Sequence, residues 1–195
     1  MAVKPRILGL CGAPGTGKTT LASWLHTKLA SAGLNCELLP EPARLLAQQG
    51  IQIDTTMGTR DYNAFLKAYQ QRDRGAQAAL AIADRTPVDH CSYLQANRNV
   101  PRGFLERHQR HARAAMGQYR LVLYLPVQFP LRNDGFRITS VKYQHELDQA
   151  IQAMLARMEV RVVEVRGSKA QRKRTIMNEV QQAWPELFNT AAATG

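Results

Sequence analysis

Gly12-Ala13-Pro14-Gly15-Thr16-Gly17-Lys18-Thr19 is the stretch of sequence that decides the fold of this chain. It matches the pattern G-x-x-x-x-G-K-[ST] of a phosphate-binding loop, or P-loop. Before it, Arg6–Cys11 is apolar and predicts a buried strand; after it, Thr19–Leu29 has apolar residues at helical spacing. Because strand and helix are the context that the pattern requires, a glycine-rich turn with a chance Lys-Thr pair is the weaker interpretation.

The residue types of this loop suit a nucleotide polyphosphate. Glycines let several backbone N–H groups point at the β-phosphate, and the following helix adds the positive end of its dipole. Lys18 is expected to span the β- and γ-phosphates, and the Thr19 hydroxyl to ligate Mg²⁺. The sequence therefore predicts ATP and Mg²⁺ as cofactors, although no pattern separates ATP from GTP. The predicted nucleotide-binding residues are Gly12, Ala13, Pro14, Gly15, Thr16, Gly17, Lys18, Thr19 and Thr20.

Strand and helix patterns alternate along the rest of the chain. This alternation predicts an α/β fold, a five-stranded parallel sheet with helices on both faces. We expect a single domain over residues 1–188, a flexible tail over 189–195 and a lid around 130–139. The other predicted strands are Cys36–Leu39, Ala79–Asp84, Arg120–Leu125 and Val160–Val165. The other predicted helices are Pro42–Gln49, Asp61–Gln77, Val88–Ala96, Phe104–Gly117, Val141–Met158 and Ser168–Trp184.

Two strand ends carry charged side chains. Glu41-Pro42-Ala43-Arg44 follows the second strand, and Asp84-Arg85-Thr86-Pro87 follows the third. The carboxyl ends of parallel strands meet at one edge of a sheet, so these groups should share a cleft with the P-loop. Three structural interpretations stay open: Glu41 as a first-turn acid of a helix, Asp84 as a helix N-cap, and Arg44 as the ion-pair partner of Glu41.

Together these motifs resemble a group of P-loop kinases. The P-loop, the Glu-Pro-Ala-Arg element and the Asp-Arg-Thr-Pro element have the order and spacing found in thymidylate kinases, deoxyribonucleoside kinases and the ribosylnicotinamide kinase domain, an AAA-type group. Arg132-Asn133-Asp134-Gly135-Phe136-Arg137 is similar to the D-G-x-R lid of the ribosylnicotinamide-kinase-like branch. The resemblance covers residues 5 to 165 and implies ATP-dependent phosphoryl transfer to an alcohol group.

The resemblance also implies roles for single residues. Glu41 would accept the proton of the acceptor hydroxyl, and Asp84 would hold Mg²⁺ through water or itself act as the base. Arg85 would steady the acceptor and the transferred phosphoryl group. Arg132 and Arg137 would neutralise charge from the lid, unless they are ordinary solvated arginines. The expected catalytic residues are Lys18, Glu41, Asp84, Arg85, Arg132 and Arg137.

One predicted helix offers a candidate surface for the acceptor. In the predicted helix Asp61–Gln77, the residues at positions 62, 65, 69 and 72 share a face by their spacing of three and four, and an aromatic ring there could stack on a base. The alternative is a core stripe with a polar edge. The predicted substrate-binding residues are Arg44, Tyr62, Phe65, Tyr69, Gln70 and Arg72.

The charge of the chain indicates a polyanionic partner. The 195 residues include 26 basic and 15 acidic side chains, a net charge of +11, and 45% of them are hydrophobic, which excludes a disordered chain. Residues 98–120 hold six arginines against one acid, and residues 166–174 hold five basic residues and no acid. We therefore expect DNA binding through an arginine-rich surface. A solvated basic face is the alternative.

These features define the functional hypotheses. The sequence lacks the D-x-x-G and N-K-x-D elements of a GTPase, and its third strand does not end in Asp-Glu as in a motor ATPase. With a nucleoside-type site and a basic surface expected to bind DNA, the predicted kinase resembles bacteriophage P-loop kinases that phosphorylate the hydroxymethyl group of 5-hydroxymethyluracil in DNA. The alternatives are a kinase of a free nucleoside, a nucleotide or nicotinamide riboside, and an ATPase or nucleotide-dependent binding protein.

The place of action is expected to be the cytoplasm, the host cytoplasm if the chain comes from a phage. The sequence has no apolar run long enough for a membrane span and no signal-peptide core. Its three cysteines are too widely spaced for a disulfide framework. Nothing in the sequence indicates the oligomeric state.

Overall fold

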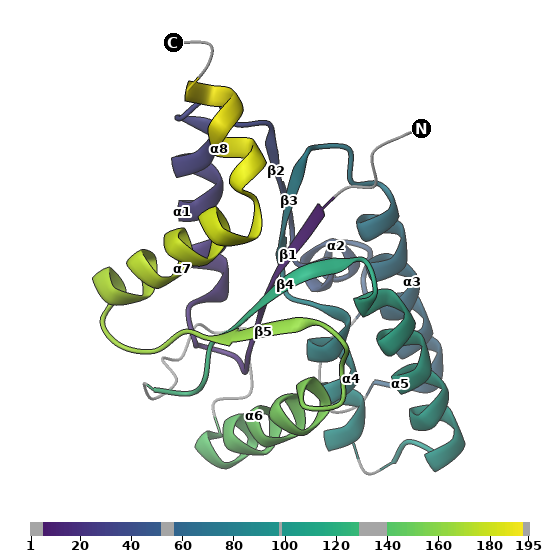
Figure 1. Cartoon of the computed structure of the whole chain (residues 1–195). Coiled ribbons are helices and arrows are strands. Elements are labelled where there is room, and N and C mark those ends of the chain that lie inside the picture. The colour runs from purple at the N-terminus through teal and green to yellow at the C-terminus, as the bar shows by residue number, and fades with distance from the viewer. Residues whose placement is uncertain (1–5, 52–56, 98, 129–139, 193–195) are drawn as a thin grey trace.

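The structure, a computed structural model, describes residues 6–51, 57–97, 99–128 and 140–192. Its centre is a five-stranded sheet in the order β2-β3-β1-β4-β5, and every neighbouring pair is parallel (Figure 1). The predicted fold class is therefore confirmed. The strands are β1 (Arg6–Cys11), β2 (Cys36–Leu39), β3 (Leu80–Asp84), β4 (Tyr119–Tyr124) and β5 (Arg161–Glu164).

Helices cover both faces of the sheet (Figure 1). On one face lie α1 (Lys18–Ala30), α7 (Lys169–Ala183) and α8 (Pro185–Ala192). On the other face lie α4 (Pro87–Ala96), α5 (Arg102–Met116) and α6 (Val141–Leu155), with α3 (Thr59–Arg74) and α2 (Pro42–Gln48) flanking them.

The central strands are apolar because both of their faces are buried. Leu8 and Leu10 of β1 point into the core beneath α1 and α7, whereas Ile7 and Cys11 point into the core beneath α4, α5 and α6. A third apolar cluster joins α2, α3, α4 and α5 beside the sheet. This burial on both faces is typical of parallel sheets and fixes the strand ends that carry the site.

The element boundaries differ from the sequence prediction mainly near the C-terminus. The predicted tail from residue 189 is helical through Ala192, because α8 begins at Pro185, directly after the fully buried Trp184. Leu187 and Phe188 pack against the same core, which explains why the chain continues as a helix. The predicted lid around 130–139 lies outside the described residues. No helix of the described chain combines the length and apolarity needed to span a membrane.

Candidate active site

The P-loop follows β1 and wraps tightly into α1. Gly12 has a φ of 154°, and a Cβ there would lie 2.3 Å from the carbonyl oxygen of Leu125, so no larger residue fits. Gly17, the residue before α1, has a φ of 94°, a left-handed conformation that favours glycine. The two glycines therefore set the close turn that the sequence pattern predicts.

The ammonium group of Lys18 lies inside the curve of this loop. It donates hydrogen bonds to the carbonyl oxygens of Gly12 (2.5 Å) and Ala13 (2.7 Å). Burial, together with the nearby guanidinium of Arg85, lowers the pKa of Lys18 to about 8. The loop thus concentrates a buried cation where a polyphosphate would be bound.

Three buried polar side chains hold the loop backbone from three different helices. They are Asp89 of α4, which accepts from the Gly12 amide (3.1 Å), Gln144 of α6, which donates to the Pro14 carbonyl (2.7 Å), and Arg172 of α7, which donates to the Thr16 carbonyl (2.8 Å). None of the three residues is predicted from the sequence to belong to the site. Asp89 and Gln144 lie among other polar residues of their helices and Arg172 lies in a basic run, so none of them has a local signal that reveals a partner far away in the chain.

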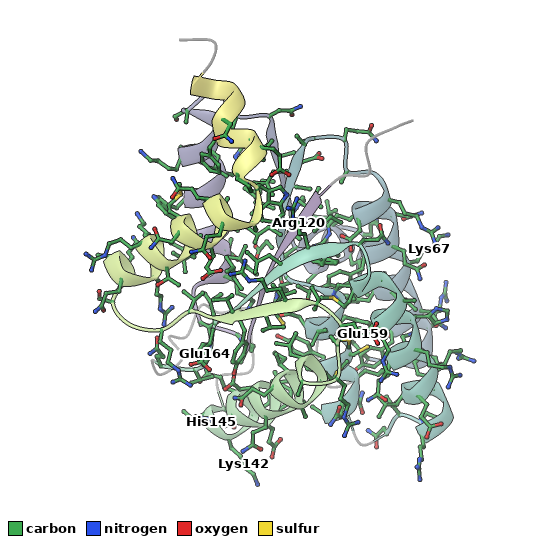
Figure 2. The ribbon with its side chains drawn as sticks, in the orientation of Figure 1. Lys67, Arg120, Lys142, His145, Glu159 and Glu164 are labelled. Atoms are coloured by element: carbon green, nitrogen blue, oxygen red, sulfur yellow. The ribbon has the colours of Figure 1, made fainter. Side chains whose placement is uncertain are left out.

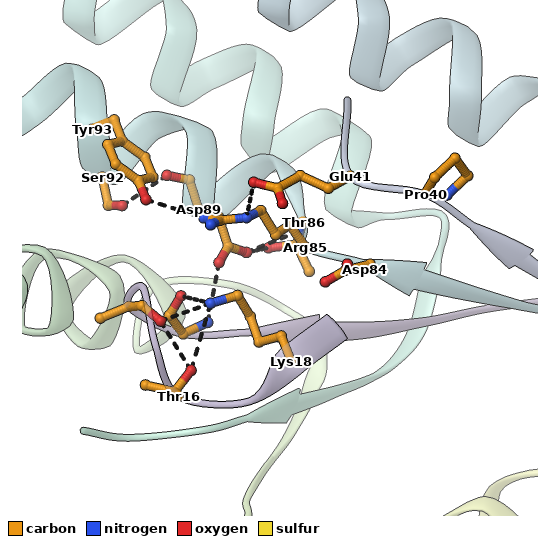
Figure 3. A network of polar contacts seen from close by, with 12 residues as sticks. Thr16, Lys18, Pro40, Glu41, Asp84, Arg85, Thr86, Asp89, Ser92 and Tyr93 are labelled. Atoms are coloured by element: carbon orange, nitrogen blue, oxygen red, sulfur yellow. Dashed lines mark hydrogen bonds and ion pairs between the residues drawn. The ribbon is translucent and has the colours of Figure 1, made fainter. Parts of the chain in front are cut away.

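Asp89 also connects the P-loop to the end of β3. Its second carboxylate oxygen accepts from the amide (2.8 Å) and the hydroxyl (2.9 Å) of Thr86, which caps α4 (Figure 3). One fully buried carboxylate therefore satisfies donors from two segments of the site. Because Thr86 is the N-cap, the interpretation of Asp84 as that cap is wrong.

Glu41 and Arg85 form a buried ion pair across the two predicted strand ends. The Arg85 Nε lies 2.5 Å from the Glu41 Oε1, and Arg85 also donates to the Tyr93 hydroxyl at 3.2 Å (Figure 3). The side chain of Arg44, the partner considered in the sequence analysis, lies outside the described residues. The structure therefore confirms that the second and third strands bring their charges together.

The backbone of Arg85 is strained. Its φ is 74°, and it has the only positive φ of a non-glycine residue among the described parts of the chain. Such a conformation costs roughly 1–3 kcal/mol and persists only where the surroundings enforce it. The Arg85 amide donates to the Leu10 carbonyl (3.0 Å), which helps to hold the conformation. Strain of this kind concentrates at functional sites.

Asp84 completes the site between the P-loop and the ion pair. Its side chain is buried, and its Oδ1 has no hydrogen-bond partner among the described residues. Burial raises the pKa of Asp84, and a hydrogen bond with Thr19 partly offsets this effect. The two residues predicted to hold Mg²⁺ therefore meet, and a hydroxyl beside an open carboxylate oxygen is a donor set that suits this cation.

Arg72 forms a buried network of polar contacts at the strand ends, which the sequence does not predict. Its guanidinium pairs with the buried Asp73 (2.8 Å) and donates to the Tyr119 hydroxyl (3.0 Å). It also donates to three carbonyl oxygens at the strand ends, those of Pro40 (3.3 Å), Asp84 (3.1 Å) and Arg85 (3.1 Å). Arg72 thus clamps the ends of β2 and β3 together, and its predicted contact with a substrate stays a prediction.

The aromatic residues of α3 pack into the third apolar cluster. The rings of Tyr62, Phe65 and Tyr69 surround the imidazole of His90, at centroid distances of 5.6 to 5.9 Å, and their side chains are buried. This is the core stripe that the sequence left open as an alternative. Gln70 is half-buried at its edge. Base stacking by these rings stays a prediction, as do the roles of Arg132 and Arg137, which lie outside the described residues.

Several solved structures have a similar fold. The NadR protein in complex with NR has a TM-score of 0.73 and 19% identity, covering 92% of this chain and 52% of its own. A deoxyadenosine kinase from M. mycoides has a TM-score of 0.68 and 16% identity, and a thymidylate kinase from Ehrlichia chaffeensis 0.63 and 12%. These two matches cover 90% and 91% of this chain and 99% of each kinase.

These comparisons support the fold, and a family match extends along most of the chain. Our chain spans about half the length of the NadR protein, while it matches the two kinases over nearly their full length. A search of the curated proteins found no match. Residues 8–172 match the family described as AAA domain. The five-stranded parallel sheet is that of P-loop kinases, and the chain belongs to the AAA domain family.

Proposed function

We propose that the protein is a kinase that transfers the γ-phosphoryl group of ATP to a nucleoside-type hydroxyl and depends on Mg²⁺. The observation that carries the proposal is the convergence of Glu41, Asp84 and Arg85 on Lys18 in the P-loop. A buried base candidate, a cation and a phosphate-binding loop are the parts that phosphoryl transfer requires. Solved structures of similar fold are named as a thymidylate kinase and a deoxyadenosine kinase, which supports the same class.

The P-loop side of the site would hold the nucleotide. The backbone N–H groups and Lys18 would bind the β- and γ-phosphates, and the hydroxyl of Thr19 and the open oxygen of Asp84 would hold Mg²⁺. When bound, Mg²⁺ would neutralise charge on the phosphate oxygens. Support for a nucleotide also comes from NadR and the deoxyadenosine kinase, which are described in complexes with AMP-PNP and dATP.

The strand-end side would activate the acceptor. Glu41 takes the proton of the acceptor hydroxyl while the hydroxyl oxygen forms a bond to the γ-phosphorus. The bond from that phosphorus to the β–γ bridging oxygen breaks, and ADP leaves with the electron pair. Arg85, held by Glu41 and Tyr93, supplies positive charge beside the transferred group. Asp84, the other base candidate, shares a hydrogen bond with Thr19, so we assign it to the metal and Glu41 to the base.

Within this class we propose that the acceptor hydroxyl belongs to nucleic acid, as the hydroxymethyl group of 5-hydroxymethyluracil in DNA does. The support is the net charge of +11, which exceeds what a small acceptor needs. A free nucleoside, a nucleotide or nicotinamide riboside is the second candidate, because the NadR structure of similar fold contains NR. Action in the cytoplasm belongs to the same proposal.

The test is transfer of labelled γ-phosphate to a panel of acceptors in the presence of Mg²⁺. The panel contains nucleosides, nucleoside monophosphates, nicotinamide riboside, plain DNA and DNA with hydroxymethylated pyrimidines. Glu41→Gln should lower kcat by roughly 10²–10⁴-fold, because it removes a general base but keeps its shape. The matched control, Glu159→Gln at an exposed position, should leave kcat unchanged.

Two outcomes would contradict the proposal. Release of inorganic phosphate with no labelled acceptor would indicate an ATPase or a nucleotide-dependent binding protein. Full transfer by Glu41→Gln would remove the base assignment, and Asp84→Asn would then have to abolish transfer for the site to remain catalytic. Label on a free nucleoside alone would keep the kinase and exclude DNA as the acceptor.

A further inference from the structure

The structure brings two rows of basic side chains together on adjacent helices. On α3, the exposed residues Arg60, Asn63, Lys67, Gln71 and Arg74 follow helical spacing, so they form one stripe without an acid. Lys67 points away from the body of the molecule (Figure 2). Arg60 to Arg74 spans about 21 Å along the helix axis, at a rise of about 1.5 Å per residue. Arg60, Lys67 and Arg74 are seven residues apart, which is about two helical turns, so they share one face of α3.

The second row lies on α5. Arg102, Arg107, Arg110 and Arg113 are exposed there. Glu106 is the only acid of this helix, and it pairs with Arg102 at 2.9 Å. The other three arginines are three residues apart, so like charges repel along the helix and cost stability. A negatively charged partner would relieve this repulsion.

The two rows belong to one side of the molecule. Phe104 of α5 and the aromatic residues of α3 share the third apolar cluster with Leu94 of α4, so both helices turn their apolar sides inward. The three helices lie on the same side of the sheet (Figure 1). Their polar sides therefore face outward together. We define the basic face by the seven cations of the two rows: Arg60, Lys67, Arg74, Arg102, Arg107, Arg110 and Arg113.

Several basic residues near α7 and β5 are paired with acids or buried. Arg120 pairs with Glu186 (2.9 Å) and Arg161 with Glu179 (2.5 Å). Arg166 pairs with Glu164, and Arg172 is buried against the P-loop. The cluster of residues 166–174, which the sequence analysis joined to the DNA-binding surface, is thus partly neutralised and lies across the sheet from α5.

We infer that the basic face docks the phosphodiester backbone of DNA, an inference that rests on the proposed function for the nature of the acceptor. Duplex DNA carries one charge per about 1.7 Å of its axis, so a row of about 21 Å meets phosphates along its whole length. An anionic membrane fits less well, because stable surface binding to lipid combines basic residues with apolar side chains that insert. The exposed large apolar residues among those described, Leu45, Val141 and Val162, lie on other elements.

The experiment measures binding of fluorescent duplex DNA by anisotropy, from about 50 to about 200 mM salt. One variant carries Arg60→Gln, Lys67→Gln and Arg74→Gln, and a second carries Arg107→Gln, Arg110→Gln and Arg113→Gln. The matched control carries Lys28→Gln, Lys169→Gln and Arg174→Gln, which removes three exposed cations from α1 and α7. Glutamine is a good helix former, so all three proteins should fold.

Each basic-face variant should bind DNA at least about tenfold more weakly at low salt, and its salt slope should fall by about 0.9 for each lost phosphate contact. The control should retain the slope of the parent protein. Equal losses in all three variants, or no binding by the parent protein at low salt, would overturn the inference. Binding to phosphatidylserine vesicles through the same residues, without binding to DNA, would also overturn it.

The same variants separate this inference from the proposed function. All three should keep full transfer to any small acceptor found in the panel, because none of the replaced residues touches the P-loop or the strand ends. DNA binding through the basic face without transfer to any acceptor would refute the kinase and leave the surface intact. Transfer to a small acceptor without DNA binding would support the kinase and refute the basic face as a DNA-binding surface.

Discussion

Replacing Arg72 by methionine tests whether this residue is a clamp or a substrate ligand. The structure gives the guanidinium an ion pair with Asp73, whose side chain is 1% exposed, and hydrogen bonds to three carbonyl oxygens and the Tyr119 hydroxyl. Methionine fills a similar volume but supplies no donor. Arg72→Met therefore leaves a buried carboxylate without its cation.

The expected cost follows from that carboxylate. Removing one partner of a buried ion pair costs about 3–5 kcal/mol, while the Tyr119 hydroxyl, at 2.7 Å from Asp73, still donates to it. We therefore expect a loss of about 4 kcal/mol, a large part of the roughly 5–15 kcal/mol that stabilises a domain. The melting temperature should fall by roughly 8–16 °C for a chain of this size.

The assay is denaturant unfolding of the parent protein, Arg72→Met and the double variant Arg72→Met/Asp73→Asn. The double variant should recover part of the loss, because it buries no unpaired charge. Arg74→Gln, at an exposed position two residues away, should change stability by less than about 0.5 kcal/mol. If Arg72→Met costs no more than this control and instead raises KM for the acceptor, the clamp is wrong and the substrate role is correct.

Three further results are expected from the buried ionisable groups. Bound phosphates favour the charged form of Lys18, whose pKa in the free protein is about 8. Nucleotide binding should therefore be accompanied by uptake of about half a proton at pH 8 and almost none at pH 6. Calorimetry in buffers of different ionisation enthalpy measures this uptake. Burial lowers the pKa of His90 to about 3, so the folded protein binds this proton less readily than the unfolded chain, and stability falls as the pH drops below about 6.5. Between pH 7 and about 4.5, the free energy of unfolding of the parent protein should fall by about 2–3 kcal/mol more than that of His90→Phe, as measured by denaturant unfolding. Because burial raises the pKa of Asp84, its charged form destabilises the fold at neutral pH, and Asp84→Asn should raise the melting temperature while it abolishes phosphoryl transfer.

The sheet and the P-loop could be predicted from the sequence because their signals are local. Alternating apolar strands and amphipathic helices identify a parallel sheet, and the loop pattern places its glycines within eight residues. The rule that chemistry gathers at the carboxyl ends of strands then brought Glu41 and Arg85 to the same edge. Their ion pair at 2.5 Å shows that a topological rule can predict a contact between residues 44 positions apart.

The support of the P-loop could not be predicted, because it depends on packing between distant helices. Arg172 lies in a run of basic residues that looks like a solvated surface, yet its guanidinium is buried on the Thr16 carbonyl. Gln144 follows the predicted lid without any pattern of its own. The helical spacing of Tyr62 and Phe65 fits both a core stripe and a binding face. Their packing around the ring of His90, which the sequence does not reveal, shows that they belong to the core.

The charges buried at the strand ends explain why Asp84 differs from its neighbours. Three buried cations, Lys18, Arg72 and Arg85, lie near four buried carboxylates, those of Glu41, Asp73, Asp84 and Asp89. Arg85 is paired with Glu41 and Arg72 with Asp73, while Asp89 is satisfied by the amides of Gly12 and Thr86. Asp84 is the carboxylate left with an oxygen that has no partner among the described residues, and burial raises its pKa. A fold selected for stability alone would replace this group, so its position next to Thr19 supports the magnesium site of the proposed function.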